Sequence, residues 1–140
     1  MKPEEMWKKS GLDGEYEAWA FGDDPDGLAE LVKKGIKTAT CSAYIFYELE
    51  GEEIPKVGEY SIIEDSNENA VCITRTTKVY ITTYDEVTAE HAFKEGEGDR
   101  SLSYWRKVHE DYFTEELKEI DRPFDQKMKL VCEEFEVVYS

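Results

Sequence analysis

The 140-residue sequence predicts an α+β domain in which a small curled sheet or β-barrel is flanked by helices. Three observations indicate this class. Long runs rich in β-branched residues fill much of the second half. Amphipathic stretches that begin with helix-capping residues lie between those runs. No repeat, low-complexity tract or Ser/Gly-rich linker divides the chain, so residues 1–140 are expected to form a single domain.

The first half of the chain predicts alternating helices and extended segments. We expect a helix over residues 3–10, an extended aromatic segment over 16–22, a helix from 24 to 35, and a strand over 38–47 with a helical or loop continuation to 53. The second helix has the clearest ends, because Asp24 can cap it, Pro25 suits its first turn and Gly35 can terminate it.

The second half predicts a hairpin, two helices and a last strand. We expect strands over residues 59–64, 71–83 and 127–139, and helices over 88–94 and 101–112. The polar segment Asp65–Asn69 would join the first two strands as a hairpin turn. The helix over 101–112 is expected to bury its apolar face, made of Leu102, Trp105, Val108 and Tyr112.

The charge of the sequence limits the partners that we expect. Acidic residues outnumber basic ones 33 to 17, which gives a formal net charge of −16 at pH 7. A protein that coats nucleic acid supplies lysine and arginine to replace the counterions of the phosphates, so a long nucleic acid is not an expected partner. A local basic rim around one cleft would still admit a short RNA. The charge therefore favours a small substrate.

Cysteine usage and hydropathy indicate a cytoplasmic protein. Cys41, Cys72 and Cys132 are odd in number and far apart, which fits neither a disulfide framework nor a zinc pattern. We expect three reduced cysteines packed as small hydrophobic residues, with a catalytic thiol as the alternative. No apolar run approaches the ~18 residues that cross a bilayer. The N-terminal segment also lacks the apolar stretch of a secretory signal. No membrane partner is expected.

A lysine and a threonine lie where a helix ends and a strand begins. Lys37 either continues the cationic end of the helix or is partly desolvated at the strand mouth. In the second case its pKa is lowered and it can take a proton from a neighbouring hydroxyl. Thr40 lies three residues further on, which in a regular strand is the opposite face. Cooperation between the two therefore requires a turn or bulge; otherwise Thr40 is an ordinary strand residue.

Three carboxylates alternate with glycines in the loop of residues 95–100. Glu95, Glu97 and Asp99 either form a solvated acidic loop or place Glu95, just past a helix end, in a cleft as an acid/base or hydrogen-bonding group. The spacing matches no calcium loop, and magnesium usually requires a substrate phosphate as a further ligand. We therefore expect no metal and no other cofactor.

The histidines and tryptophans have plain structural interpretations. His109 shares a helical face with Trp105, so we expect it to be packed and hydrogen bonded, and His91 is expected to pack against or solvate its short helix. Trp19, Tyr104 and Trp105 could stack on a nucleobase. Aromatic residues on amphipathic elements nevertheless belong more often to the core.

Four segments together resemble the bacterial ASCH domain family, namely residues 16–22, 35–40, 57–58 and, above all, 95–109 with the sequence EGEGDRSLSYWRKVH. The resemblance spans nearly the whole chain. Its Gly-x-Lys-x-x-Thr element is short, but the combination with the acidic glycine-rich loop and the Tyr-Trp-Arg helix is fairly specific. The resemblance implies a PUA-like β-barrel closed on one side by helices, with a cleft for RNA or nucleoside ligands.

Some smaller members of this family are amidohydrolases that remove the acetyl group from N(4)-acetylcytidine with a lysine, a threonine and a glutamate. The resemblance places these roles on Lys37, Thr40 and Glu95. Thr40 would then attack the acyl carbon, Lys37 would take the hydroxyl proton, and Glu95 would orient or protonate the leaving amine. The chain is longer than those enzymes, which leaves the natural substrate open.

Further substrate contacts are expected from the residues around these three, namely Trp19, Thr38, Glu97, Asp99, Arg100 and Trp105. Two alternatives use the same cleft without amide hydrolysis, because other family members are described as RNA binders or ribonucleases. The net charge of −16 disfavours both of them moderately. The oligomeric state stays open.

Overall fold

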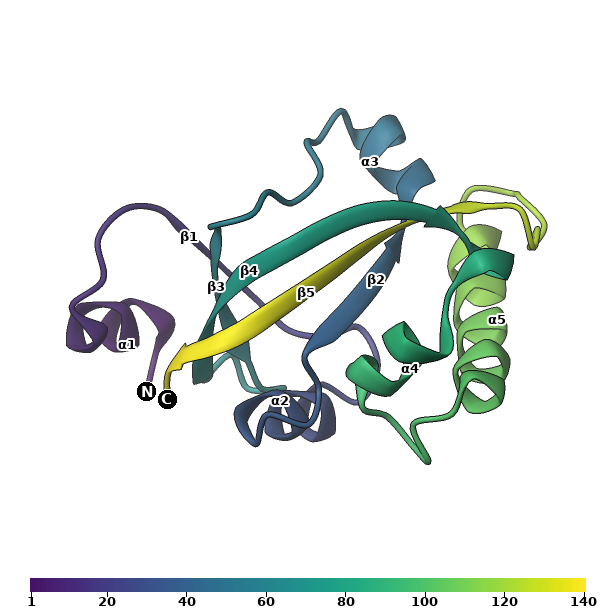
Figure 1. The fold of residues 1–140 in the computed structure, drawn as a ribbon. Coiled ribbons are helices and arrows are strands. Elements are labelled where there is room, and N and C mark those ends of the chain that lie inside the picture. Colours follow the sequence, from purple (N-terminus) through teal and green to yellow (C-terminus); the bar gives the residue numbers. More distant parts are fainter.

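One mixed sheet of five strands organises the computed structural model (Figure 1). The strands are β1 (Tyr16–Trp19), β2 (Ala39–Ala43), β3 (Tyr60–Glu64), β4 (Ala70–Thr83) and β5 (Lys129–Tyr139). Their order across the sheet is β1-β3-β4-β5-β2. The β1–β3 pair is parallel and the other three pairs are antiparallel. The α+β class is confirmed.

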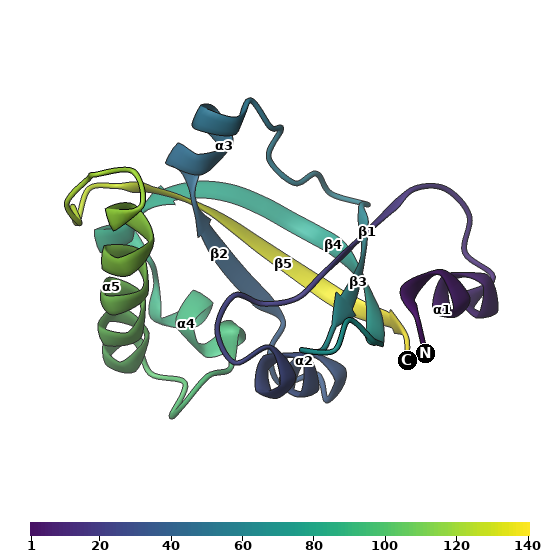
Figure 2. The same ribbon diagram turned by 180° about the vertical axis from the view of Figure 1, so that it is seen from behind.

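Five α-helices and one short 3₁₀ helix connect the strands. They are α1 (Pro3–Ser10), α2 (Pro25–Lys33), α3 (Tyr44–Glu50), η1 (Tyr84–Glu86), α4 (Ala89–Glu95) and α5 (Leu102–Lys118). Figures 1 and 2 show α4 and α5 together beside one end of the sheet, and α1 beside the other end, where both termini lie. No helix combines the length and the apolarity needed to span a bilayer.

Local sequence signals explain most element ends. The side chain of Asp24 accepts a hydrogen bond from the Gly27 N–H and caps α2, as expected. Thr88 and Ser101 cap α4 and α5 in the same way. In the β3–β4 turn, the Asp65 carboxylate accepts hydrogen bonds from the N–H groups of residues 67 and 69, both at 2.9 Å. The predicted hairpin is therefore confirmed.

The sheet curls but does not close into a barrel. β4 and β5 are 14 and 11 residues long, and their pairing contains two register shifts, of which one lies between Thr76 and Lys78. Such irregularities bend strands and increase their twist. β1 and β2 remain the two edges and share no backbone pairing. The expectation of a barrel is thus met only by a barrel-like, open sheet.

The core divides along the curved sheet into three apolar clusters. The cluster under α4 and α5 contains Trp105, Phe113 and Leu130. The cluster under α2 centres on Val32 and Ile63, and a third joins α1 to the sheet. No disulfide joins the three cysteines; Cys72 and Cys132 pack in the core as expected, whereas Cys41 is only partly buried. Burial of these side chains is the main favourable term in the stability of the domain.

Two sequence predictions were wrong in detail. Residues 44–47 form the start of α3 rather than the end of a strand, since β2 already ends at Ala43. Helix α5 continues to Lys118, and Tyr112 is 38% exposed rather than buried. Phe113 and Leu117 occupy the core in its place, because Trp105, Phe113 and Leu117 lie eight and four residues apart on one face of the longer helix.

Candidate functional site

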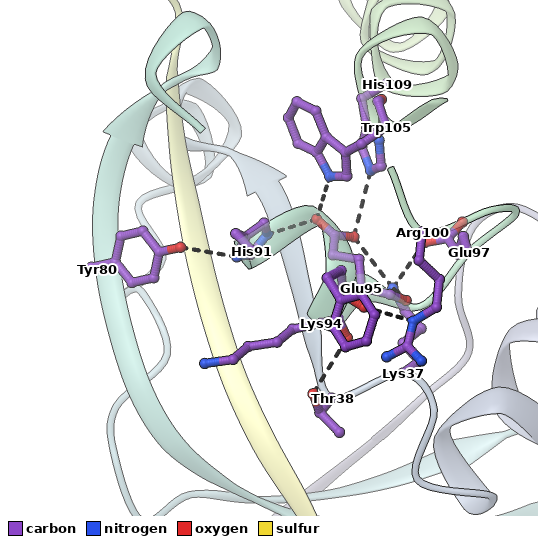
Figure 3. A network of polar contacts seen from close by, with 11 residues as sticks. Lys37, Thr38, Tyr80, His91, Lys94, Glu95, Glu97, Arg100, Trp105 and His109 are labelled. Atoms are coloured by element: carbon purple, nitrogen blue, oxygen red, sulfur yellow. Dashed lines mark hydrogen bonds and ion pairs between the residues drawn. The ribbon is translucent and has the colours of Figure 1, made fainter. Parts of the chain in front are cut away.

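Lys37 and Glu95 form a buried ion pair between the start of β2 and the end of α4. Their side chains are 1% and 2% exposed, and the Lys37 Nζ lies 3.3 Å from the Glu95 Oε1. The same ammonium donates hydrogen bonds to the Glu97 Oε2 at 2.9 Å and to the main-chain carbonyl of Glu95 at 3.3 Å. All three hydrogens of this ammonium therefore have an acceptor (Figure 3).

Two glycine turns bring these distant residues together. Gly35 adopts φ +77° after α2, and the irregular stretch that follows directs Lys37 toward α4 before β2 begins. Gly96 adopts φ +74° at the end of α4. A Cβ at this position would lie 2.5 Å from the carbonyl oxygen of Ile36, so only glycine allows the two backbones to approach. This contact holds Glu95 against Lys37.

The Glu95 carboxylate also has hydrogen bonds with Trp105 and His91 and lies close to His109. Its Oε2 lies 2.7 Å from the Trp105 Nε1 and 2.7 Å from the His91 Nε2. Its Oε1 lies 3.6 Å from the His109 Nε2. Figure 3 shows Trp105 and His109 approaching from α5 while His91 approaches from α4. The carboxylate is thus surrounded by donors and held in one orientation.

Each histidine is held in place through its other ring nitrogen. The His91 Nδ1 lies 2.9 Å from the Tyr80 hydroxyl, and the His109 Nδ1 lies 2.9 Å from the Trp105 carbonyl oxygen. A neutral His91 satisfies its contacts if Tyr80 donates to Nδ1 and the Nε2–H donates to Glu95. The His109 ring stacks on Trp105 with centroids 4.2 Å apart. Both histidines are therefore fixed around the carboxylate.

These contacts decide the charge states of the pair. Burial on its own opposes ionisation of Glu95, but the Lys37 ammonium and the hydrogen bonds from His109 and His91 hold its pKa well below the ordinary carboxyl value. Burial likewise opposes the charge on Lys37, yet Glu95 and Glu97 raise the lysine pKa. Of the two alternatives left open by the sequence, the one with a lowered Lys37 pKa is not supported, because two carboxylates outweigh the desolvation. Lys37 rests as an ammonium.

A small chamber of about 90 Å³ lies beside the pair. Its polar lining consists of Lys37, Thr40, Cys41, Glu95, Glu97 and His109, with Asp23 at its side. Thr40 reaches the chamber because the chain before β2 is irregular, which meets the condition that the sequence set for cooperation with Lys37. No hydrogen bond is formed by the Thr40 side chain, so its hydroxyl is free to meet a ligand.

A much larger cleft of about 660 Å³ adjoins the chamber. Five residues line both cavities, namely Phe21, Gly22, Thr40, Cys41 and Tyr112. The cleft is lined by residues of all five strands, including the edges β1 and β2, so it lies against the curled sheet and extends to both of its edges. A ligand in the cleft can therefore place one end in the chamber beside Thr40.

The structure brings five of the nine predicted site residues to these cavities. Lys37, Thr40, Glu95 and Glu97 line the chamber, and Trp19 lines the large cleft. The other four line neither cavity, namely Thr38, Asp99, Arg100 and Trp105.

Each of those four has a structural contact instead. Trp105 is 2% exposed and binds Glu95, so it offers no free face for stacking. Arg100 donates to the carbonyl oxygens of Phe93 and Ile36, and Asp99 accepts from the Ser101 N–H. The Thr38 hydroxyl donates to the Lys94 carbonyl oxygen at 3.4 Å. These contacts fix the loop that carries Glu95 and Glu97.

Several residues of the site were not predicted from the sequence. His91 and His109 were expected to pack, yet both contact Glu95, and Tyr112 and Glu133 line the cleft. The spacing of His109 four residues after Trp105 was the only sequence signal for its place. The thiol of Cys41 is close to the same carboxylate; burial, followed by Glu95, raises its pKa well above the ordinary value. A protonated thiol is a poor nucleophile, which disfavours a catalytic cysteine.

The arrangement has oxygen and nitrogen donors, but a cation already occupies it. Donor atoms of Glu95, Glu97 and His109 lie within 4.8 Å of one another, as do those of Cys41, His91 and Glu95. The Lys37 ammonium, however, already contacts both carboxylates. It supplies the positive charge that a bound metal would otherwise bring.

The fold belongs to a known class of protein, the PUA-like domains with a mixed, curled sheet and flanking helices. Within that class the chain is a member of the ASCH domain family, which matches residues 17–139. An ASCH domain from Lactobacillus crispatus JV V101 is 30% identical with a TM-score of 0.92, and the match covers 98% of this chain and 94% of that one.

Two further solved structures share the fold. A protein from Enterococcus faecalis V583 is 37% identical with a TM-score of 0.85, covering 97% of this chain and 87% of that chain. A hypothetical protein at 18% identity and a TM-score of 0.57 supports the fold alone, with coverage of 87% and 97%. No curated protein matches the sequence significantly. The matches support the family and the fold.

Proposed function

We propose that this ASCH domain hydrolyses the amide bond of a small acylated amine in the chamber beside Lys37, Glu95 and Thr40. The observation that carries the proposal is the convergence of Lys37 and Glu95, which lie 58 residues apart in sequence, at a chamber also lined by Thr40. The adjoining cleft of about 660 Å³ falls within the ~300–1,000 Å³ of ordinary small-molecule sites. N(4)-acetylcytidine is the first substrate to test, as the family resemblance implies.

The charge states of Lys37 and Glu95 change the catalytic roles that the family resemblance implies. Thr40 attacks the acyl carbon, so the Thr40 oxygen forms a bond to that carbon while the carbonyl oxygen gains negative charge. Lys37, already an ammonium, cannot take the hydroxyl proton in this state. It is instead suited to stabilise the negative oxygen through its fixed positive charge; a hydrogen bond to that oxygen would replace one of the three that the ammonium now makes. Glu95 and Glu97 hold the ammonium in position.

The proton of Thr40 then needs an acceptor in the chamber. Glu97, which is 21% exposed, lines it and can pass that proton to the leaving amine. The C–N bond breaks, the amine leaves, and water hydrolyses the acyl ester on Thr40 to a carboxylic acid. The balance is amide plus water to acid plus amine, and the reaction uses no cofactor.

RNA binding and RNA cleavage remain alternatives that use the same cleft. Neither is favoured by the cavity, because lysine, arginine and histidine are all missing from the 19 residues that line the large cleft. Phosphate recognition relies on such side chains. The lining of the cleft therefore favours a small-molecule substrate over a polyanion.

The test is an assay of the purified protein with N(4)-acetylcytidine, in which cytidine and acetate are measured together. Release of both in equal amounts, unchanged by a metal chelator, is expected. Salt should have little effect on a neutral nucleoside, whereas RNA binding through several phosphates weakens steeply as salt rises. A rate equal to that of buffer for this and other small acylated amines would contradict the proposal. Loss of activity in chelator would replace it with a metal-dependent reaction.

A further inference from the structure

The large cleft has a lining of one charge sign. Among its 19 residues are five glutamates, namely Glu17, Glu52, Glu53, Glu59 and Glu133, and no cationic side chain. A concave surface lined by one sign of charge concentrates its field and raises the local concentration of ligands of the opposite sign. The cleft therefore differs from a site that receives a phosphate.

Glu133 is the cleft carboxylate that pairs with Thr40 across two neighbouring strands. It lies on β5 directly opposite Thr40 of β2 in the strand register, and both residues line the cleft. Its Oε2 accepts a hydrogen bond from the Thr76 hydroxyl at 3.0 Å. Burial raises the pKa of Glu133, and the charges of Glu59 and Glu17 raise it further. Glu133 therefore has carboxylates as its charged neighbours and no ion pair of its own, whereas Glu53 at the cleft is paired with Lys56 at 3.0 Å.

The adjoining chamber has no net positive charge with which to receive a multiply charged anion. Its one lysine, Lys37, contacts both Glu95 and Glu97, so the three groups together carry one excess negative charge. A phosphate group carries about −1.5 to −2 charges at pH 7. A nucleotide or an RNA would thus place its phosphate next to carboxylates, and no unpaired lysine or arginine would balance the negative charges of the two groups. This is unfavourable wherever the phosphate lies in the two cavities.

The aromatic side chains of the cleft also favour a cation, independently of the glutamates. Trp19, Phe21, Tyr47, Tyr60 and Tyr112 all line it. Trp19 and Phe21 pack edge to face, with centroids 4.9 Å apart, and thus form a continuous aromatic wall. The face of an aromatic ring attracts ammonium groups, and tryptophan does so most strongly. Carboxylates combined with aromatic faces are the chemistry that recognises a protonated amine.

We infer that the substrate is an acylated amine that carries a second, protonated amino group, that is, a monoacylated diamine or polyamine. This inference rests on the proposed function for the acyl end, which enters the chamber beside Thr40. The ammonium end lies in the cleft among Glu133, Glu59 and the aromatic side chains. Hydrolysis adds water across the amide and releases a carboxylate and a diamine, whose new amino group takes up a proton at neutral pH.

The first experiment measures binding apart from hydrolysis. Calorimetry of the protein with spermidine, cytidine and cytidine 5′-monophosphate compares a cation, a neutral ligand and an anion in one buffer. We expect spermidine to bind at least about tenfold more tightly than cytidine, and the monophosphate to bind most weakly. Tighter binding of the monophosphate than of cytidine would overturn the inference. So would saturation by Mg²⁺ or Ca²⁺ in a protein that does not bind spermidine.

Charge-neutral variants locate the cation. Glu133→Gln keeps the shape and the acceptor for Thr76, and should weaken spermidine binding by about tenfold; Glu59→Gln should weaken it by about threefold. Glu4→Gln removes the same charge from α1, which does not line the cleft, and is the matched control. Equal losses in all three variants would show a diffuse effect of net charge and would overturn the assigned place.

Turnover assays then separate this inference from the proposed function. We expect N-acetylputrescine or N1-acetylspermidine to be hydrolysed with a higher kcat/KM than N(4)-acetylcytidine. Hydrolysis of N(4)-acetylcytidine alone, without competition by spermidine, would uphold the amidohydrolase and overturn the cationic substrate. Binding of spermidine at Glu133 without hydrolysis of any amide would uphold the cation site and overturn the amidohydrolase.

Discussion

The Lys37 ammonium and the Glu95 carboxylate are 3.3 Å apart, and both side chains are almost completely buried. Such a pair stabilises the fold only while both members are charged and satisfied, because each isolated charge would be strongly disfavoured in the interior. Here the carboxylate has donors from Lys37, His91 and Trp105. The pair therefore fixes the geometry of the chamber and makes the domain sensitive to its removal.

Removal of one charge should destabilise the protein strongly. Lys37→Met leaves the Glu95 and Glu97 carboxylates without their cation, and we expect a loss of about 3–5 kcal/mol in the free energy of unfolding. Urea unfolding monitored by circular dichroism measures it. Lys56→Met is the control, because Lys56 is 66% exposed and pairs with an exposed glutamate. It should cost less than about 1 kcal/mol. Similar losses in both variants would contradict the buried pair.

The contribution of the pair should depend on pH in a defined window. The lowered Glu95 pKa contributes stability that is complete above the ordinary carboxyl pKa and is lost as pH falls through the folded-state value. The raised Lys37 pKa contributes stability that is complete below the ordinary lysine pKa and is lost as pH rises through the folded-state value. The stability difference between wild type and Lys37→Met should therefore be greatest between about pH 5 and pH 10 and smaller outside that window. A constant difference from pH 3 to pH 11 would exclude this linkage.

The contribution of Glu133 to stability should depend on pH in the opposite direction to that of Glu95. Its raised pKa, due first to burial, means that the folded protein holds the proton more tightly than the unfolded chain. This contribution is complete below the ordinary carboxyl pKa and is lost as pH rises through the folded-state value. At pH 7, Glu133→Gln should therefore raise the melting temperature by a few degrees, while it weakens cation binding. Glu4→Gln should leave the melting temperature nearly unchanged. A lower melting temperature for Glu133→Gln would contradict the crowding of carboxylates in the cleft.

The turn at Gly96 should tolerate no side chain. Gly96→Ala meets both the cost of φ +74° and the overlap with the Ile36 carbonyl oxygen, so we expect a loss of about 2–4 kcal/mol and a displaced Glu95. Gly51→Ala has a similar φ of +65° with no atom within 4 Å of the added carbon. It should cost only about 1–2 kcal/mol. Equal losses would show that the close approach to Ile36 does not matter.

The sequence predicted the elements whose ends carry local signals and missed features that depend on distant contacts. Asp24 and Thr88 cap helices where expected, because a cap needs only the next three residues, and Ser101, expected as the first residue of its helix, is the cap. The buried face of α5 was placed one residue too early at Tyr112, since the helix is six residues longer than its apolar pattern suggested. Closure of the sheet could not be predicted, because it depends on the spacing of β1 and β2 across the cleft.

At the site, too, the sequence indicated some residues and missed the contacts that depend on distant parts of the chain. Lys37, Thr40 and Glu95 were named from a resemblance, and the structure places all three at one chamber. The sequence left open whether the pKa of Lys37 is lowered, because nothing in it shows that Glu97 lies 2.9 Å from the ammonium. His109 looked like a packing residue, and it does pack on Trp105. Its second contact, to Glu95, exists only because the turn at Gly96 brings α4 against the start of β2.

The role of Thr40 as the attacking group is tested most directly by turnover of the Thr40→Val variant. The Thr40 side chain forms no hydrogen bond and valine keeps its branched shape, so this change removes the hydroxyl with little effect on folding. Thr82→Val, on β4 outside both cavities, is the matched control. With N(4)-acetylcytidine and N-acetylputrescine as substrates, kcat should fall at least about 10³-fold in Thr40→Val and stay unchanged in Thr82→Val. A Thr40→Val protein that is folded and retains wild-type turnover would contradict amide hydrolysis by Thr40.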